Sequence, residues 1–423
     1  MKAVIMAAGE GKRLRPLTYT RPKPMIPIAG KPHLQILIED LKKAGISEVI
    51  LIVGYLQEQI REFFKNGSEF GINIQYVTQD TQLGTGHAAL YAESLVESEP
   101  FLLLNGDILL APNVFSRLIN KYNRSSCSSV LSIVKVPNPS SYGIVHFDNK
   151  TEEALQIIEK PTSEQIPEDP YTNAGLYVFN SQIFDAIRNT PKSSRGEIEI
   201  TDSIQRLITR GESIKVFKIE DFWIDLGKPW DLLNANQYLL DQISGANQGT
   251  IEKNVTIKGK VIIGEDTIIR SGSYLVGPLY IGSHSDIGPN CYIREYCSIG
   301  NNVRVGHACE LKNTIIFDNS HVPHLSYIGD SIIGSHVNLG AGTITANLRF
   351  DKKSVPMTIK GERMDSGRKK MGAIIGDYVQ TGIGTTLMPG VKIGPYSIVG
   401  PNMNLWDDIP PRSVVIEKPR KVE

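Results

Sequence analysis

Residues 280–311 read YIGSHSDIGPNCYIREYCSIGNNVRVGHACEL, and an apolar residue returns at every sixth position of this stretch. The same step extends in both directions, through Ile251, Ile257, Ile263, Ile269, Leu275, Ile281, Ile287, Ile293, Ile299, Val305, Leu311 and Phe317. Glycine often follows the apolar residue. A six-residue repeat is typical of a parallel β-helix, in which each six residues form one side of a triangular coil. We therefore expect the step residues to point inward and the glycines to lie at corners.

The repeat changes frame near Pro323, is absent over about 346–372, and then continues to residue 405. The later steps fall on Ile328, Ile333, Leu339, Ile375, Thr381, Leu387, Ile393, Val399 and Leu405, with Thr381 as the exception to apolar character. This pattern predicts a left-handed parallel β-helix over 251–410, followed by a tail over 411–423.

Three of the four cysteines fit the same repeat. Cys291, Cys297 and Cys309 each lie four residues after a step, where other coils have Val255, Val261, Thr267, Ser273 and Ser285. The pattern indicates a second, small, inward-facing position, so we interpret these thiols as core packing rather than as metal ligands or nucleophiles. No CxxC pair occurs, which argues against a zinc or redox motif.

Before residue 235 the pattern is different, because short apolar strands alternate with amphipathic helices. Strands are predicted over 2–8, 48–55, 72–79 and 100–108, and helices over 34–45, 56–67 and 85–98. This alternation predicts an α/β fold with a Rossmann-like, mostly parallel sheet. We expect this domain to span 1–235 and a linker to span 236–250. In such sheets ligands bind at the carboxyl ends of the strands.

The overall composition narrows the class of protein. The chain has 423 residues, 41% of them apolar, and a formal net charge of zero. Zero net charge argues against a broad surface for nucleic acid or for an anionic membrane. No apolar run approaches the roughly 18 residues of a membrane span, and the apolar start MKAVIM is too short for a signal peptide. These features favour a cytoplasmic protein.

Residues 7–32, AAGEGKRLRPLTYTRPKPMIPIAGKP, combine glycines, basic residues and prolines at the end of the first predicted strand. Glycine lets the backbone approach a ligand closely and basic side chains suit an anion, so the stretch predicts a phosphate site. The parts GEGKRLRPLT and RPKPMIPIAGKP resemble the signature of sugar-1-phosphate nucleotidyltransferases. That resemblance implies attack of a sugar-1-phosphate oxygen on the α-phosphorus of a nucleoside triphosphate, with release of pyrophosphate.

The resemblance implies a role for each matching residue. Ala8, Gly9 and Gly11 would bring backbone N–H groups to the triphosphate, Arg13 would hold its outer phosphates, and Lys23 would reach the α-phosphate. The alternative for Arg13 and Lys23 is an ordinary solvated charge in a loop.

Two aspartates match the metal-binding positions of the same family, which uses Mg²⁺. Asp107 follows the apolar strand in LLLNGDI, and Asp225 lies in FWIDLGKPWD. One or two carboxylates together with substrate phosphates are the usual ligands of Mg²⁺. For Asp225 the alternative is a helix cap.

Further motifs of this half resemble the base and sugar pockets. QDTQLGTGHAAL implies Gln79, Gly84 and Thr85 at a pyrimidine base, so UTP and dTTP remain alternatives. YGIV, IIEKP and TNAGLYVF imply sugar-phosphate contacts from Gly143, Glu159, Lys160 and Asn173. Each of these stretches could also be ordinary structure.

The stretch HVPHLSYIGDSIIGSHVNLGAGTITANLRFD, residues 321–351, resembles the acetyltransferase domain of the bifunctional glucosamine-1-phosphate acetyltransferase / N-acetylglucosamine-1-phosphate uridyltransferase family. The implied reaction is acetyl transfer from acetyl-CoA to the 2-amino group of an amino-sugar-1-phosphate. His324 would be the general base. Tyr327 and Asn338 would hold the sugar phosphate or the amine, and Asn347 would help with the sugar or the acetyl group. His321 is expected to be a core residue.

The chain departs from the bacterial members of that family and looks more like the archaeal ones. Leu348 stands where the bacterial pattern has an aromatic residue, and the segment 347–377 is longer and basic. Its residues Lys352, Lys353, Arg368, Lys369 and Lys370 would bind a sugar phosphate or the phosphates of CoA, or would be solvated loop charges. The resemblance also implies a homotrimer.

Two other functions remain open at this level. A nucleotidyltransferase alone, with thymidylyl, uridylyl or guanylyl transfer, would use the β-helix for assembly or regulation. A non-enzymatic scaffold is disfavoured, because the signature glycine, basic and aspartate residues are all present.

Overall fold

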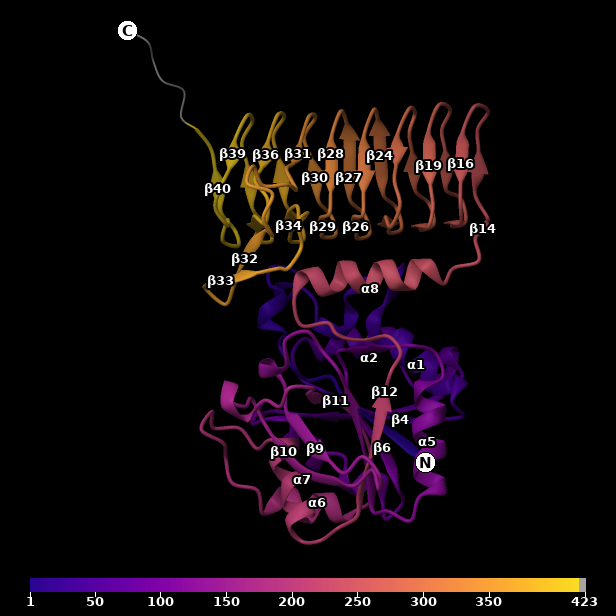
Figure 1. Ribbon diagram of the computed structural model, residues 1–423. Helices are drawn as coiled ribbons and strands as arrows, with labels where there is room; N and C mark the ends of the chain where they lie inside the picture. The colour runs from indigo at the N-terminus through magenta and orange to yellow at the C-terminus, as the bar shows by residue number, and fades with distance from the viewer. Residues whose placement is uncertain (418–423) are drawn as a thin grey trace. The chain divides into compact units, whose positions relative to one another are not determined.

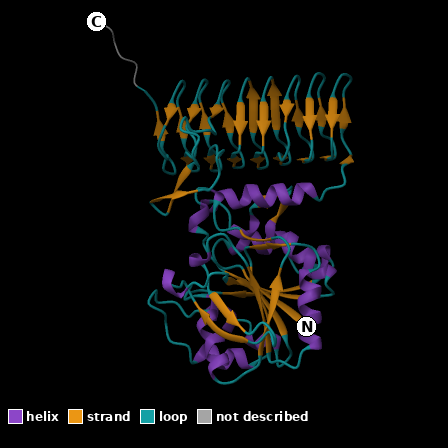
Figure 2. Cartoon of the chain, viewed as in Figure 1, coloured by secondary structure: helices purple, strands orange, loops and turns teal. Residues whose placement is uncertain are grey.

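The computed structural model describes residues 1–417, so the last six residues of the expected tail, 418–423, lie outside the described residues. The chain forms two compact units, drawn in Figure 1 and coloured by secondary structure in Figure 2. The first contains residues 1–10, 22–25 and 33–225. The second contains 11–21, 26–32 and 226–423, so two short N-terminal segments belong to the C-terminal unit.

The sheet of the first unit has a parallel half and an antiparallel half. β1 (Lys2–Met6) pairs in parallel with β4 (Glu48–Val53) and β6 (Phe101–Asn105), and β5 (Asn73–Thr78) pairs in parallel with β4. β11 (Tyr171–Phe179) is antiparallel to β6, β8 (Ser129–Val134) and β9 (Ile144–Phe147). β10 (Ala154–Ile158) pairs with β9, and β12 (Ile214–Ile219) runs parallel to β8.

Helices cover both faces of this sheet, as the sequence pattern predicts. Ala3 and Ile5 of β1 pack in one core with α1 (His33–Lys43), α2 (Gln57–Phe64) and α5 (Val114–Arg124). Val4 packs in the other core with α3 (Thr85–Leu90), α4 (Glu93–Val96), α6 (Gln182–Arg188) and α7 (Ile200–Thr209). The alternation of side chains along β1 therefore supplies both cores. The helix expected over 85–98 is two helices, α3 and α4.

The second unit contains a parallel β-helix of three sheets (Figure 2). The first sheet consists of β14 (Ala246–Asn247), β17 (Val261–Ile263), β20 (Leu279–Ile281), β23 (Ser298–Ile299), β26 (Ile315–Ile316), β29 (Ile332–Ile333), β34 (Ile374–Ile375) and β37 (Lys392–Ile393). The second consists of β15 (Thr250–Ile251), β18 (Ile268–Ile269), β21 (Asp286–Ile287), β24 (Arg304–His307), β27 (His321–His324), β30 (Asn338–Leu339), β35 (Gln380–Thr381), β38 (Ile398–Val399) and β40 (Val414–Val415). The third consists of β16 (Thr256–Lys258), β19 (Tyr274–Val276), β22 (Tyr292–Ile293), β25 (Glu310–Lys312), β28 (Tyr327–Gly329), β31 (Ile344–Thr345), β36 (Thr386–Leu387) and β39 (Asn404–Leu405).

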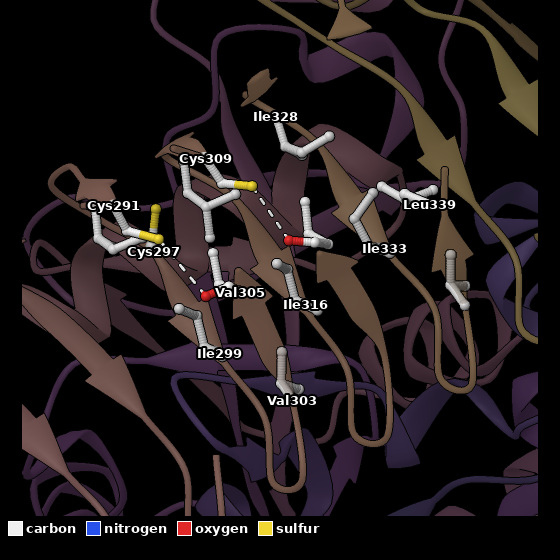
Figure 3. Close-up of a cluster of buried hydrophobic side chains, with 14 of the residues drawn as sticks. Cys291, Cys297, Ile299, Val303, Val305, Cys309, Ile316, Ile328, Ile333 and Leu339 are labelled. Atoms are coloured by element: carbon white, nitrogen blue, oxygen red, sulfur yellow. Dashed lines mark hydrogen bonds between the residues drawn. The ribbon is translucent and has the colours of Figure 1, made fainter. Parts of the chain in front are cut away.

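The interior of the coil confirms the two inward positions expected from the repeat. Figure 3 shows Cys291, Cys297 and Cys309 among the isoleucines and valines of the core. The Cys291 thiol donates to the carbonyl of Gly306 at 2.8 Å, and burial raises the pKa of Cys297 to about 12. These thiols are packing residues. The exceptional Thr381 is also buried, and its Oγ1 accepts the N–H of Gly340 at 3.0 Å.

The expected position of the frame change was wrong. Ile316, not Phe317, belongs to the core of the coil, so the step from Leu311 has five residues. A second five-residue step runs from Ile328 to Ile333. Accordingly, strand partners are 18 residues apart for Tyr280 and Ser298 but 17 apart for Ser298 and Ile315 and for Ile315 and Ile332.

The reason for the wrong frame is that two neighbouring residues are apolar. Phe317 is buried as well, but it lies beneath the Arg21 guanidinium, 4.5 Å from the ring centroid. His321, expected in the core, is exposed on β27, because the residue next to it, Val322, takes the inward position.

Helix α8 (Pro229–Asp241) directly precedes the first strand of the β-helix and belongs to the second unit. The end of α8 covers the first part of the expected 236–250 linker. The expected domain limits, 1–235 and 236–250, stay a prediction. The same unit contains the 3-10 helices over Lys12–Leu14 and Leu17–Tyr19 and the hairpin of β2 (Pro27–Ile28) with β3 (Lys31–Pro32). A second hairpin, β32 (Pro356–Ile359) with β33 (Glu362–Asp365), lies in the long insertion of the β-helix.

Candidate functional site

In the first unit, two carboxylates and an ammonium group meet at the end of the sheet. β7 (Ile108–Leu110) pairs antiparallel with β13 (Trp223–Asp225), which places Asp225 opposite Ile108, the residue after Asp107. Lys23 contacts the Asp107 carboxylate directly and lies 3.8 Å from Oδ1 of Asp225. The three predicted residues are therefore brought together.

This donor set fits a hard divalent cation. Carboxylate oxygens are the ligands that Mg²⁺ prefers, and it usually takes its other ligands from water and substrate phosphates. Within residues 1–417 no group of three or more histidine, cysteine or acidic residues could hold a metal by itself. A metal at Asp107 and Asp225 would therefore depend on the phosphates of a bound substrate.

A histidine that was not predicted from the sequence contacts the backbone next to this cluster. His33, the first residue of α1, is buried, and its Nε2 lies 2.7 Å from the carbonyl oxygen of Ile108. Burial lowers the pKa of His33 to about 4, so the ring is neutral and Nε2 is the donor. Its bond holds the backbone directly after Asp107.

The stretch that contains the proposed base-binding residues Gln79, Gly84 and Thr85 contacts the chain just after β1, and the Thr85 hydroxyl accepts the N–H of Ile200 at 3.1 Å. Gln82 Nε2 donates to the carbonyl of Ala8 at 2.8 Å, and the buried Gln79 contacts His87 Nδ1 through Nε2 at 3.2 Å. Gly84 has φ +105°, and a Cβ there would lie 2.6 Å from the Ile198 carbonyl. Gly84 therefore has a packing role whether or not it contacts a base.

Three of the four proposed sugar-binding residues also lie together. The Asn173 N–H donates to the Gly143 carbonyl at 2.8 Å, and a Cβ on Gly143 would lie 3.0 Å from Oε2 of Glu159. Burial raises the pKa of Glu159, against the opposing effect of Arg195 at 3.5 Å. The side chain of Lys160 is exposed.

The glycine-rich signature is divided between the two units. Gly9 belongs to the first unit, and a Cβ there would meet no atom within 4 Å. Gly11 and Arg13 belong to the second unit. Gly11 has φ 66°, and its carbonyl accepts a hydrogen bond from the Thr18 hydroxyl at 2.9 Å.

In the β-helix, His324 ends β27 with an exposed side chain and a fixed backbone. Its carbonyl accepts hydrogen bonds from Ser326 Oγ at 2.8 Å and from the Gly342 N–H at 3.1 Å. Asn338 lies on the next strand, β30, in register with His321, and is exposed. The two predicted residues therefore present polar side chains on adjoining strands.

Tyr327 and Asn347 contact each other in a partly buried polar cluster. Asn347 Nδ2 donates to Tyr327 Oη at 3.0 Å and to Asp330 Oδ2 at 2.6 Å. Lys312 Nζ donates to the same Asp330 oxygen at 3.0 Å. Burial raises the pKa of Tyr327, so the phenol stays protonated. The sequence analysis did not single out Asp330 or Lys312.

The basic residues of the insertion differ in their surroundings. Arg368 is partly buried, hydrogen-bonds Asn234 of α8 and lies 3.7 Å from Asp330. Lys352, Lys353, Lys369 and Lys370 are exposed.

Comparison with known families agrees with this two-part geometry. Residues 2–242 match the family described as Nucleotidyl transferase, and residues 275–387 match the GMPPB C-terminal domain.

Curated relatives match the chain from end to end. The Bifunctional protein GlmU of Methanococcus vannielii is 43% identical over 426 residues, covering 99% of this chain and 98% of the relative. The chain belongs to the GlmU family of bifunctional proteins. A second relative, the Bifunctional sugar-1-phosphate nucleotidylyltransferase/acetyltransferase of Sulfurisphaera tokodaii, is 42% identical, with 97% of this chain and 98% of the relative covered.

Solved structures match a little over half of this GlmU-family chain. A putative glucose-1-phosphate thymidylyltransferase from Bacillus anthracis is 26% identical with a TM-score of 0.52, covering 58% of this chain and 98% of that chain. A UDP-glucose pyrophosphorylase gives the same identity and TM-score over 57% of this chain. Within residues 1–417, no helix combines the length and apolar character that a membrane span requires.

Proposed function

We propose that this GlmU-family enzyme makes a UDP-N-acetylated amino sugar in two steps. Acetyl transfer from acetyl-CoA to the amine of glucosamine-1-phosphate comes first. Uridylyl transfer from UTP to the resulting N-acetylglucosamine-1-phosphate follows, with release of pyrophosphate. The observation that carries the proposal is the presence in one chain of both polar clusters, Lys23 with Asp107 and Asp225, and Tyr327 with Asn347.

For uridylyl transfer, the phosphate oxygen of the sugar forms a bond to the α-phosphorus while the bond to the β-phosphate oxygen breaks. The chain must align two polyanions and reduce their repulsion. Lys23 is the cation placed for this, and Asp107 and Asp225 would hold Mg²⁺, which neutralises phosphate charge when bound. Ala8, Gly9, Gly11 and Arg13 would hold the triphosphate, with Gln79, Gly84 and Thr85 at the base.

On the sugar side, Glu159 would accept a hydrogen bond from a sugar hydroxyl. Gly143 and Asn173 adjoin it, and Lys160 follows it in sequence as the group that would meet the sugar phosphate. Burial raises the pKa of Glu159, and Arg195 and Thr201 oppose that shift, so a sugar hydroxyl would join these two groups at the carboxylate.

For acetyl transfer, the substrate amine must lose a proton before it attacks the thioester carbonyl. An imidazole titrates near neutral pH and suits this task, and the exposed His324 is in a position to accept that proton. The carbonyl carbon then forms the amide bond, and CoA leaves as the thiol. Tyr327, Asn338 and Asn347 would orient the amino-sugar phosphate, while Lys353 would contact substrate phosphate.

The first experiment measures thiol release from acetyl-CoA by the full-length protein with glucosamine-1-phosphate, and with galactosamine-1-phosphate in parallel. Release with glucosamine-1-phosphate, together with pyrophosphate release from UTP, is the expected result. Replacing UTP by dTTP tests the base. His324→Ala should abolish thiol release and leave pyrophosphate release unchanged, with His307→Ala on the adjoining strand as the matched control.

A second candidate is a nucleotidyltransferase in which the β-helix only assembles the enzyme. The match of residues 275–387 to the GMPPB C-terminal domain favours it. So does the 35% identity to a Low-salt glycan biosynthesis nucleotidyltransferase of Haloferax volcanii over 81% of this chain. No thiol release with either amino sugar, from protein that still releases pyrophosphate, would select this candidate.

Two further expectations belong to the proposal. A homotrimer would appear in light scattering as three times the mass of the chain. The cytoplasmic location stays a prediction, which cell fractionation would test.

A further inference from the structure

We propose that Asp330 is a positioning residue for acetyl transfer: it orients the Asn347 amide and the Tyr327 phenol, and helix α8 holds it through Asn313. The inference rests on the acetyl transfer proposed above. It assigns a role to a buried carboxylate and to a helix outside the β-helix coils.

The cluster lies where the coil departs from its repeat. Both five-residue steps turn from the third sheet to the first, and their corners contain Asn313 and Asp330, with φ of 47° and 49°. The 346–373 insertion leaves at the same corner of the next coil, because Ile344 pairs with Thr386 while Ile332 pairs with Ile374. Three successive coils are therefore altered at one corner.

Asp330 is a buried anion whose partners all donate to it. It is 2% exposed, and its Oδ1 accepts from Asn313 Nδ2 at 2.8 Å. Its Oδ2 accepts from Asn347 Nδ2 at 2.6 Å and from Lys312 Nζ at 3.0 Å. A buried carboxylate is stable only when such donors satisfy it.

This carboxylate fixes which way the Asn347 amide faces. A carboxylate only accepts hydrogen bonds, so the Asn347 nitrogen, not its oxygen, must face Asp330. The same nitrogen donates to Tyr327 Oη at 3.0 Å. Tyr327 is thus an acceptor toward Asn347, and its own proton remains available for an acceptor on the substrate.

Helix α8 supports Asp330 through Asn313. Gln237 Nε2 donates to Asn313 Oδ1 at 2.9 Å, which turns the Asn313 nitrogen toward Asp330. One turn earlier on the helix, Asn234 accepts a hydrogen bond from Arg368, which lies 3.7 Å from Asp330. Figure 1 shows α8 running beside the coils of the β-helix, within the same unit.

The chain provides a matched control for Asp330. Asp377 also follows the sequence Ile-Gly at a corner, is 3% exposed, and hydrogen-bonds Thr20 and Arg21. Asp377 thus resembles Asp330 in its burial and in its place after Ile-Gly. None of its hydrogen bonds goes to Tyr327 or Asn347.

The test compares Asp330→Asn with Asp377→Asn in the full-length protein, using acetyl-CoA and glucosamine-1-phosphate. Asp330→Asn removes the charge and keeps the shape, and we expect kcat for thiol release to fall ~10-fold with the KM for acetyl-CoA within about twofold. Asp377→Asn should leave both constants within about twofold of wild type. Pyrophosphate release from UTP should stay unchanged in Asp330→Asn.

A double-mutant cycle with Tyr327→Phe separates positioning from general stability. If Asp330 acts through Tyr327, Asp330→Asn should cost less than about threefold in the Tyr327→Phe background. Additive losses, a wild-type kcat for Asp330→Asn, or an equal loss in Asp377→Asn would each overturn the inference.

Should Asp330→Asn fail to fold, a second variant, Asn313→Ser, breaks the hydrogen bonds from Gln237 through Asn313 to Asp330 but keeps the carboxylate. It should lower kcat about threefold, non-additively with Tyr327→Phe, and wild-type kinetics would overturn the inference.

The same assay distinguishes this inference from the function on which it rests. Absence of thiol release from the wild-type protein overturns the proposed acetyl transfer, and this inference with it. Release from the wild type that Asp330→Asn does not alter overturns the inference alone.

Discussion

Single residues in the first unit show how burial prepares charged groups for a reaction. Lys23 lies near two carboxylates, so its single positive charge offsets one of their two negative charges and leaves the cluster suited to a further cation. His33 stabilises the backbone next to Asp107 and contributes as a neutral ring. Lys23 is the residue proposed to meet the substrate, whereas His33 holds the loop backbone next to Asp107.

Replacing Lys23 by Ala should remove the cation from this cluster. We expect pyrophosphate release to fall by at least about 100-fold, because a fixed cation at a transferring phosphoryl group stabilises the charge of the transition state. Thiol release should be unchanged. Lys43→Ala, a change at a lysine that is 71% exposed on α1, serves as the control. An equal loss of both activities would indicate misfolding instead.

His33 makes stability depend on pH. Its pKa is about 4 in the folded chain and 6.5 when unfolded, so between these values the unfolded state binds more protons. The free energy of unfolding should therefore fall as pH falls from 6.5 to 4, by roughly 3 kcal/mol in total. His33→Gln keeps a donor but does not titrate. Urea unfolding across this range should show a shallower slope for the variant, and equal slopes would contradict the assignment.

At the scale of elements, the repeat in the sequence determines most of the β-helix. Inward positions are predictable from Ile263 to Leu311 because each six-residue step fills one side of the coil, whereas Ile251 and Ile257 of the first coil, also expected to point inward, are exposed. The step that ends at Ile316 is not, since Ile316 and Phe317 are both apolar and the sequence alone does not choose between them. Asn313, a hydrogen-bond partner of Asp330, lies in that step.

The candidate sites could also be predicted only in part from the sequence. Residues in family motifs, such as Lys23, Asp107, Tyr327 and Asn347, could be named from the sequence, and the fold brings each pair together. His33 could not, because a lone histidine at the start of an amphipathic helix carries no signal of the carbonyl that it will meet.

The burial of three cysteines in the β-helix core predicts that their thiols react slowly with alkylating reagents. Cys291, Cys297 and Cys309 are at most 2% exposed, and burial raises the pKa of each. Because the thiolate is the reactive form, brief treatment with iodoacetamide at pH 8 should label these three only after unfolding. Peptide mass spectrometry would read the labelling, and labelled Cys297 in native protein would contradict the packing.

At the scale of the whole molecule, the chain crosses between its two units inside the signature loop. Residues 22–25, with Lys23, belong to the first unit, whereas the segments on either side belong to the second. Arg21 is the last residue of one such segment. It donates to Asp377 and to Ser335 and stacks on Phe317, all within the second unit.

Arg21→Met should leave Asp377 buried without its cation. The pair is separated by 2.7 Å and the Asp377 side chain is 5% exposed, so the loss should cost about 3 kcal/mol of stability in the second unit. Differential scanning calorimetry would detect a lower transition temperature. Arg412→Met, which removes an exposed arginine from the ring of Tyr396, is the control. Equal transition temperatures for Arg21→Met and wild type would show that the pair contributes little.

The pairing of Arg21 with Asp377 also has a consequence for the order of synthesis. The two residues are 356 positions apart in the chain. A ribosome adding roughly 5–20 residues per second needs on the order of 20–70 s to pass from one to the other. For that time Arg21 has been made but Asp377 has not. The pair therefore forms only after the coil that contains Asp377 has been made, and a chain that stops before Asp377 lacks this link within the second unit.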